Sequence, residues 1–282
     1  MRQHHFIRLF AWNLGSLRLW QFLLVIAMFV SIGLFSASEV RSAMQNANVW
    51  HAVLLSFAGP GVWGVSLPGA LIWLVPHLLF FYLIGNIANE ELMNRGYAIL
   101  PLIGARRSWW WGKLTIILFI SLAYILLWFL VVFLGAVFVL PCTWITRPFL
   151  NSGDPWPFSS DISIFEIFTW IFCLYTSTLL TLSLAQIAIS VWWRRSFHAY
   201  VFIVIVTILS WLLGTDLPEL ARWLPGSQSM LSRHTFLDPS IPNFTFEWSL
   251  LYNGFIFLIT LGLSLYHIRR LDIFGNPVAD IR

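Results

Sequence analysis

Residues 114–140 read LTIILFISLAYILLWFLVVFLGAVFVL and contain no charged side chain. A helix of about 20 apolar residues crosses the hydrocarbon core of a bilayer, because each residue advances the helix by about 1.5 Å. This stretch is therefore long enough and apolar enough to cross a membrane. Five more charge-free intervals are also long enough to cross a membrane. They lie at 19–38, 42–89, 167–193, 196–215 and 248–268.

The overall composition agrees with a membrane protein. Of the 282 residues, 59% are hydrophobic and 10% are charged, whereas a soluble domain carries about 25% charged residues. The 17 Trp and 25 Phe suit a protein that meets two lipid–water interfaces. The net charge of +4 does not indicate nucleic-acid binding, because the basic residues lie in small clusters between apolar stretches. Cys142 and Cys173 form neither a disulfide framework nor a metal-binding motif.

These intervals predict an all-α integral membrane protein with six transmembrane helices in a single domain that covers 1–282. The interval 42–89 is long enough for two spans, but we assign only one to it. A helix in its first half would be broken at mid-depth in the membrane by Gly59-Pro60-Gly61. The predicted spans are about 19–38, 67–89, 114–140, 167–192, 197–214 and 248–268.

Three other segments are predicted to lie along the membrane surface. Residues 6–17 mix apolar side chains with Arg8 and predict an amphipathic interfacial helix before the first span. Residues 43–58 are read as a second amphipathic segment, with its larger apolar side chains close to one face. In the outer loop 215–247, the order Thr215-Asp216-Leu217-Pro218 predicts the start of a short interfacial helix.

The distribution of positive charge predicts the orientation. With the N-terminus inside, twelve of the 16 Lys and Arg residues lie on the cytoplasmic side and four lie outside. The acidic residues show the opposite bias, with four inside and eight outside. Cytoplasmic loops of membrane proteins are enriched in Lys and Arg, so both termini are expected in the cytoplasm and the chain in the cell membrane.

Several kinds of catalytic or nucleotide site are not indicated by the sequence. Gly112-Lys113 lacks the upstream glycine of a phosphate-binding loop and is followed by Leu114. The sequence contains no His-Glu-x-x-His zinc motif and no Gly-x-Ser-x-Gly nucleophile elbow. We therefore expect no catalytic residue, metal or cofactor in this chain. His77 is the one histidine well inside a span, and it is either hydrogen-bonded within the bundle or a ligand or proton relay.

The segment between the second and third spans carries the densest pattern of charge and aromatic residues. It begins with Glu90-Glu91, continues through a short helix-forming piece with Arg95-Gly96, and is interrupted at Pro101. The basic pair Arg106-Arg107, three tryptophans and Lys113 then lead into the third span. Two interpretations fit: a helix parallel to the membrane that offers a surface to a partner, or an inner loop whose basic side chains snorkel beside an aromatic belt.

This arrangement resembles the permease subunits of ABC-2-type ATP-binding-cassette transporters. Members of that family have six spans with both termini in the cytoplasm. After their second span, a cytoplasmic coupling segment carries a Glu, a Gly, a Pro or Gly, an Arg and a Lys in this order. The matching residues here are Glu91, Gly96, Pro101, Arg106 and Lys113. The family's usual Thr after the glycine is replaced by Tyr97, and the interval from Glu to Gly is one residue longer than in many members.

The resemblance implies a transporter subunit without a nucleotide site of its own. It would pair with a second permease, identical or homologous, and with two copies of a cytoplasmic ABC ATPase that binds ATP and Mg. Residues 90–106 would be the coupling segment, in which Glu90, Glu91, Arg95 and Gly96 bind the ATPase. Arg106, Arg107 and Lys113 would fix that segment at the inner interface. Arg194 and Arg195, in the short loop after the fourth span, are membrane anchors or a second contact with the ATPase.

Two other interpretations stay open. The order Glu90-Glu91-x-x-x-Arg95-Gly96 matches the first motif of the CAAX-type intramembrane endopeptidases, in which paired carboxylates activate water. Those enzymes also need a Phe-x-x-x-His motif, and no histidine here has a Phe four residues before it. The remaining interpretation is a non-catalytic membrane scaffold.

Overall fold

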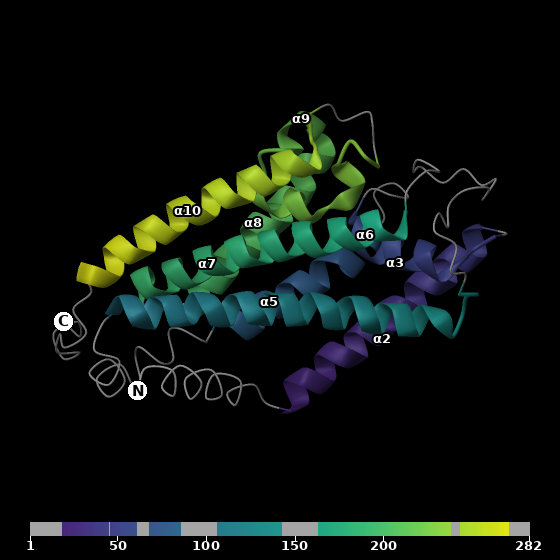
Figure 1. Cartoon of the computed structure of the whole chain (residues 1–282), viewed down its shortest axis with the longest axis horizontal. Helices are drawn as coiled ribbons and strands as arrows, with labels where there is room; N and C mark the ends of the chain where they lie inside the picture. The colour runs from purple at the N-terminus through teal and green to yellow at the C-terminus, as the bar shows by residue number, and fades with distance from the viewer. Residues whose placement is uncertain are drawn as a thin grey trace.

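The computed structural model describes residues 19–44, 46–60, 68–85, 106–142, 163–237 and 243–270. Every regular element in these ranges is a helix (Figure 1), and six helical stretches are long and apolar enough to cross a membrane. The six-span all-helical fold predicted from the sequence is confirmed. The six stretches are α2 (Leu19–Ala43), Pro68–Gly85, α5 (Arg106–Val137), Ile164–Trp193, α8 (Ser196–Asp216) and α10 (Phe246–Arg270).

The fourth stretch is made of three consecutive helices. It begins with α6 (Ile164–Trp170), where Ser163 and Glu166 form a reciprocal capping box at the N-terminus. A π-helical segment, η1 (Ile171–Tyr175), follows, and α7 (Thr176–Trp193) completes the span. One π-helical turn inserts an extra residue into the helix and rotates the side chains that follow it.

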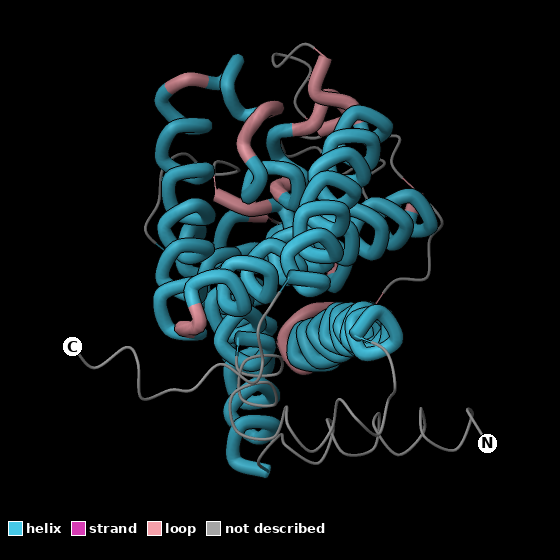
Figure 2. Tube along the Cα trace, turned by 90° about the vertical axis from the view of Figure 1, so that its left-hand side faces the viewer, coloured by secondary structure: helices cyan, strands magenta, loops and turns pink. Residues whose placement is uncertain are grey.

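Successive spans run in opposite directions, and α5 lies among the others (Figure 1). This helix packs against α2, α7 and α10 and against the short α3 (Val49–Ala58). In the view at right angles to Figure 1, the helices group together at varied angles, some seen along their axis and others from the side (Figure 2). Many large apolar side chains on α2, α8 and α10 are exposed at the outside of this bundle, as expected for surfaces that face lipid.

Glycine permits the backbones of α2 and α5 to approach each other. A Cβ atom at Gly33 would lie 2.8 Å from the carbonyl oxygen of Val132. On the opposite helix, a Cβ atom at Gly135 would lie 3.5 Å from the Cα atom of Gly33. Small residues at such a crossing permit the close van der Waals packing that associates helices in lipid.

The position of α3 corrects one prediction. The amphipathic surface segment expected over 43–58 is wrong, because all ten residues of α3 are buried. The helix is apolar on every side, so burial in the bundle removes more hydrocarbon surface from water than an interfacial position. Asn48 and His51 form its N-terminal capping box. The predicted break is confirmed: α3 ends before Gly59, whose φ of +84° is unfavourable for other residues.

The helix ends differ from the predicted spans where charged residues occur. The first helix continues past Glu39 and Arg41 to Ala43, and α5 begins at Arg106 instead of 114. Charge-free intervals locate the hydrocarbon core, whereas helices continue into the interface, where water and headgroups solvate charged side chains. The predicted N-terminal amphipathic helix lies outside the residues that the structure describes.

The crossing of α2 and α5 predicts a sensitive position. Gly33→Ala should lower the free energy of unfolding by about 1–3 kcal/mol, because the new methyl group meets the backbone of α5. Gly254→Ala in α10 is the matched control, since no atom outside its own helix lies within 4 Å of that methyl group. Thermal unfolding in detergent, followed by tryptophan fluorescence, measures both. Equal unfolding temperatures for the two variants would contradict the close approach.

Candidate functional site

The predicted coupling residues are only partly within the described structure. Glu90, Glu91, Arg95 and Gly96 lie outside the described residues. Arg106 and Arg107 are the first two residues of α5, where only the backbone is described. The structure therefore describes this candidate site from Lys113 onward and at the loop that carries Arg194 and Arg195.

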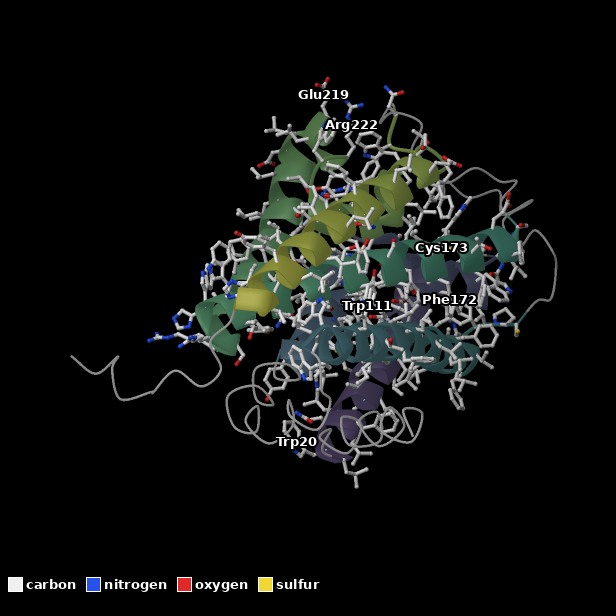
Figure 3. All side chains as sticks on the ribbon, turned by 60° about the vertical axis from the view of Figure 1, so that its left-hand side comes forward. Trp20, Trp111, Phe172, Cys173, Glu219 and Arg222 are labelled. Atoms are coloured by element: carbon white, nitrogen blue, oxygen red, sulfur yellow. The ribbon has the colours of Figure 1, made fainter. Side chains whose placement is uncertain are left out.

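Lys113 lies two turns into α5 and is buried, with 2% of its surface exposed. Its ammonium nitrogen lies 5.8 Å from the centre of the Trp109 ring, within the range of a cation–π interaction. Trp109 and Trp110 are buried, whereas Trp111 is exposed and labelled in Figure 3. Consecutive helical side chains are about 100° apart, so three adjacent tryptophans cannot all face lipid. Of the three tryptophans in this aromatic cluster, Trp111 alone is exposed in the described bundle.

Arg194 and Arg195 form the connection between α7 and α8. Arg194 has a φ of +55° at the C-terminus of α7, and Arg195 precedes the first residue of α8. Both side chains are exposed. The connection between α7 and α8 lies at the same end of the bundle as the start of α5 (Figure 1). We call this the inner end, after the orientation predicted from the sequence.

The opposite, outer end carries a buried polar segment that the sequence did not reveal. The predicted short helix begins at Pro218, but it lasts for only one turn as α9 (Pro218–Ala221). The chain continues through two 3-10 helices, η2 (Pro225–Ser229) and η3 (Leu231–Arg233), whose residues are largely buried. Glu219 and Arg222 of the first part lie at the periphery (Figure 3). We call residues 217–237 the outer cap.

Arg233 joins the outer cap to the end of α8. Its guanidinium group donates to the carbonyl oxygens of Ser210 and Trp211, at 3.1 and 2.8 Å. It also donates to the hydroxyl oxygens of Ser227 and Thr215, both at 2.9 Å. Burial lowers the pKa of Arg233 to about 10, so the side chain stays charged at neutral pH. The carbonyl oxygens at the C-terminal end of a helix carry partial negative charge and stabilise this cation.

His234 joins the outer cap to α10. Its ring nitrogens lie 2.9 Å from the Met230 carbonyl oxygen and 2.8 Å from the Ser249 hydroxyl oxygen. The ring is fully buried between aromatic neighbours, Phe236 and Phe244. Burial lowers its pKa to about 4, so His234 is neutral at neutral pH.

His77 joins the same cap to the second span. Its Nδ1 atom lies 2.7 Å from the Trp73 carbonyl oxygen, and its Nε2 atom lies 3.2 Å from the Ser229 hydroxyl oxygen. The interpretation of His77 as a hydrogen-bonded residue inside the bundle is confirmed. Within the described ranges, no three His, Cys, Asp or Glu side chains are grouped so that they could hold a metal ion.

The outer cap thus contacts several spans through separate polar groups. Arg233 holds α8, His234 holds α10, and Ser229 holds the Pro68–Gly85 helix. The Phe236 ring also stacks on Trp170 of α6, with 3.8 Å between ring centres. A relative movement of these spans must therefore carry the cap along or break these contacts. The sequence alone could not predict these contacts, because nothing in it distinguishes Arg233 from any other charged residue of an outer loop.

Removal of the Arg233 guanidinium group should release the outer cap. Arg233→Met leaves two hydroxyl and two carbonyl oxygens without this donor, and we expect a loss of about 3 kcal/mol in unfolding free energy. Hydrogen exchange of residues 217–237 should also become faster. Arg41→Met is the matched control, since Arg41 is exposed and its hydrogen bond to the Val139 carbonyl oxygen is 3.5 Å long. Unchanged exchange in the Arg233 variant would contradict the assigned role.

His234 predicts a dependence of stability on pH. The histidine pKa is about 4 in the folded protein and 6.5 in the unfolded chain, so the unfolded chain binds the proton first. The folded state should therefore lose stability as the pH falls from 6.5 to about 4. Unfolding temperatures across that range should fall less steeply for His234→Gln than for the unaltered protein. Parallel pH profiles would show that the histidine is not buried in its neutral form.

Comparison of the chain with known protein families, with curated proteins and with solved structures finds no match.

Proposed function

We propose that this chain is the permease subunit of an ABC-2-type transporter in the cell membrane. A separate cytoplasmic ATPase would supply the energy that moves an amphipathic or apolar cargo, such as a lipid, a peptide or an antibiotic. One observation carries the proposal. The order Glu91, Gly96, Pro101, Arg106 and Lys113 connects the second and third of six membrane helices, on the side that holds twelve of the 16 Lys and Arg residues.

The packing of α5 supports a role for that connection in coupling. Helix α5 begins at Arg106, the last residue of the proposed coupling segment 90–106, and is continuous to Val137. It contacts α2, α3, α7 and α10, so a displacement of α5 must also shift these helices or change their packing. Because packed helices move as rigid bodies, a push on residues 90–106 reaches the outer end through α5.

The proposed cycle uses the ATPase as the source of differential binding energy. Two copies of the ATPase close on ATP and Mg, and they bind one arrangement of the permease pair more tightly than the other. Glu90, Glu91, Arg95 and Gly96 form the proposed contact, while Arg106, Arg107 and Lys113 hold the segment at the inner interface. The exposed Arg194 and Arg195 offer a second contact at the same end. At the outer end, the hydrogen bonds of the outer cap hold several spans together and so favour the arrangement in which that end of the permease is closed.

The side chains within the bundle favour an amphipathic cargo over an ion. Buried polar residues of the spans include neutral hydroxyl and amide groups such as Ser183, Gln186 and Asn253. Ion-coupled carriers commonly bury carboxylates near the middle of the membrane. Apolar faces of α2, α8 and α10 are exposed. In the proposed transporter, a second permease, identical or homologous, would cover part of this surface and lipid the rest.

Purification of the tagged chain from its native membrane in mild detergent tests the proposal. We expect a soluble ATPase with a phosphate-binding loop to copurify in stoichiometric amount and to hydrolyse ATP. The double variant Glu90→Gln with Glu91→Gln should lose most of this ATPase, because the contact loses two negative charges. Glu219→Gln at the outer end is the control and should retain it.

The same preparations distinguish the alternatives. An intramembrane endopeptidase built on Glu90 and Glu91 would cleave a membrane peptide without ATP, and the double variant would abolish cleavage. A scaffold would show neither ATP hydrolysis nor cleavage. A pure chain without an ATPase from the native membrane contradicts the permease proposal.

A further inference from the structure

The helix Pro68–Gly85 is held to its neighbours by three side-chain hydrogen bonds. His77 pairs with Ser229 of the outer cap. At the adjacent residue, the Tyr124 hydroxyl group of α5 donates to the Pro76 carbonyl oxygen at 2.7 Å. Towards the inner end, the Gln186 side-chain amide of α7 donates to the Phe81 carbonyl oxygen at 2.9 Å.

The innermost of these contacts lies directly beside a glycine. Gln186 is fully buried, and its amide nitrogen occupies the space beside Gly85. A Cβ atom at Gly85 would lie 2.7 Å from that nitrogen, which is closer than real Cβ contacts. The absence of a side chain at Gly85 therefore permits the amide to reach the carbonyl oxygen one turn earlier in the helix. Two residues on different spans are fitted to each other at this point.

Gln186 belongs to a polar stripe on α7 that faces the neighbouring helices. Ser183 and Ser190 precede and follow it by three and four residues, so all three lie on one face of α7. All three are fully buried. Within the described structure, the hydroxyl groups of Ser183 and Ser190 and the side-chain oxygen of Gln186 make no hydrogen bond, whereas the Gln186 amide nitrogen bonds to the second span. The contact is thus specific to the longer amide side chain.

The location of this contact gives it mechanical importance. Pro76 has no N–H group, so the helix lacks one internal hydrogen bond there and can bend at that residue. The portion after Pro76 leads to Gly85, and Glu90 follows five residues later in the sequence. Gln186 therefore holds the portion of the second span that lies between the bend and the coupling segment.

We propose that Gln186 is a positioning residue that clamps the inner part of the second span to α7 and so fixes the start of the coupling segment. The inference rests on the proposed function for its role in coupling, although the clamp itself does not. With the clamp in place, a movement of the ATPase displaces the inner part of the second span, and α7 moves with it because Gln186 binds both. Helix α5, which follows the coupling segment, moves at the same time. Without the clamp, the inner part of the second span bends at Pro76 and absorbs the movement.

A distance measurement between spin labels tests the clamp. Labels at the exposed positions Tyr82→Cys and His198→Cys, with Cys142 and Cys173 replaced by Ser, report the separation of the second span from the start of α8. The protein with Gln186 in place should give one narrow distance distribution. Gln186→Leu keeps a side chain of similar size but removes the amide, and Gly85→Ala displaces the amide; both should lose the narrow peak. Ser183→Ala, on the same face, is the control and should retain it.

A double substitution separates the clamp from general damage to folding. The shorter side chain in Gln186→Ala leaves room for a methyl group at residue 85. The double variant Gly85→Ala with Gln186→Ala should therefore be no less stable than Gln186→Ala alone. Strictly additive losses of stability, or an unchanged narrow peak in Gln186→Leu, would overturn the clamp. If Gln186→Leu does not accumulate in the membrane, Gly85→Ala and Ser183→Ala carry the comparison.

The role in coupling is read from the response to ATP. In the complex with the copurified ATPase, a non-hydrolysable ATP analogue should shift the label distance in the control protein. Gln186→Leu should retain the ATPase but lose this shift. If no ATPase copurifies while Gln186→Leu still loses the narrow peak, the clamp stands and the proposed function fails. If the variant keeps the full shift, the coupling role of Gln186 is overturned.

Discussion

The close approach of α2 and α5 at Gly33 and Gly135 is the constraint on which the arrangement of the bundle depends. Helix α5 packs against several other helices at once. The close approach of α2 leaves space around α5 for these other neighbours. Lipid tails are as apolar as leucine, so burial of hydrocarbon drives helix association weakly within a membrane. Tight packing between backbones supplies the missing attraction, and two glycines on facing helices provide it here.

Polar groups then determine which arrangement of the spans is stable. Several buried hydrogen bonds join parts of the chain that are far apart in sequence, such as Tyr175 with Phe57 and Gln186 with Phe81. An unpaired polar group is costly in hydrocarbon, so these pairs make a shifted or rotated helix unfavourable. Arg233 shows the same principle with a charge, since helix-end carbonyl oxygens surround its guanidinium group. Although its helices are short, the outer cap forms such hydrogen bonds with three different spans.

The sequence was sufficient for the number and approximate position of the spans, because hydrocarbon excludes charge regardless of tertiary structure. It was insufficient for α3, whose apolar surface has the same composition whether it faces lipid or protein. The partners of Arg233 could not be predicted either, because Ser210 and Trp211 lie in a different helix. The close fit of Gly85 and Gln186 depends on residues that are about 100 positions apart. The proposed coupling residues came from motif order alone, and Lys113 is the member whose side chain the structure describes.

The buried helix α3 has a consequence for the synthesis of the protein in the membrane. It has ten residues, about half of the length needed to span the bilayer, so it cannot be inserted as a helix of its own. Its C-terminal carbonyl at Phe57 is bound by Tyr175, which is made 118 residues later. During translation α3 can pack against α2, which precedes it, but the bond to Tyr175 can form only after the fourth span has been made. Biogenesis of this chain is therefore more than a succession of completed hairpins, since the last contacts of this short helix depend on later spans.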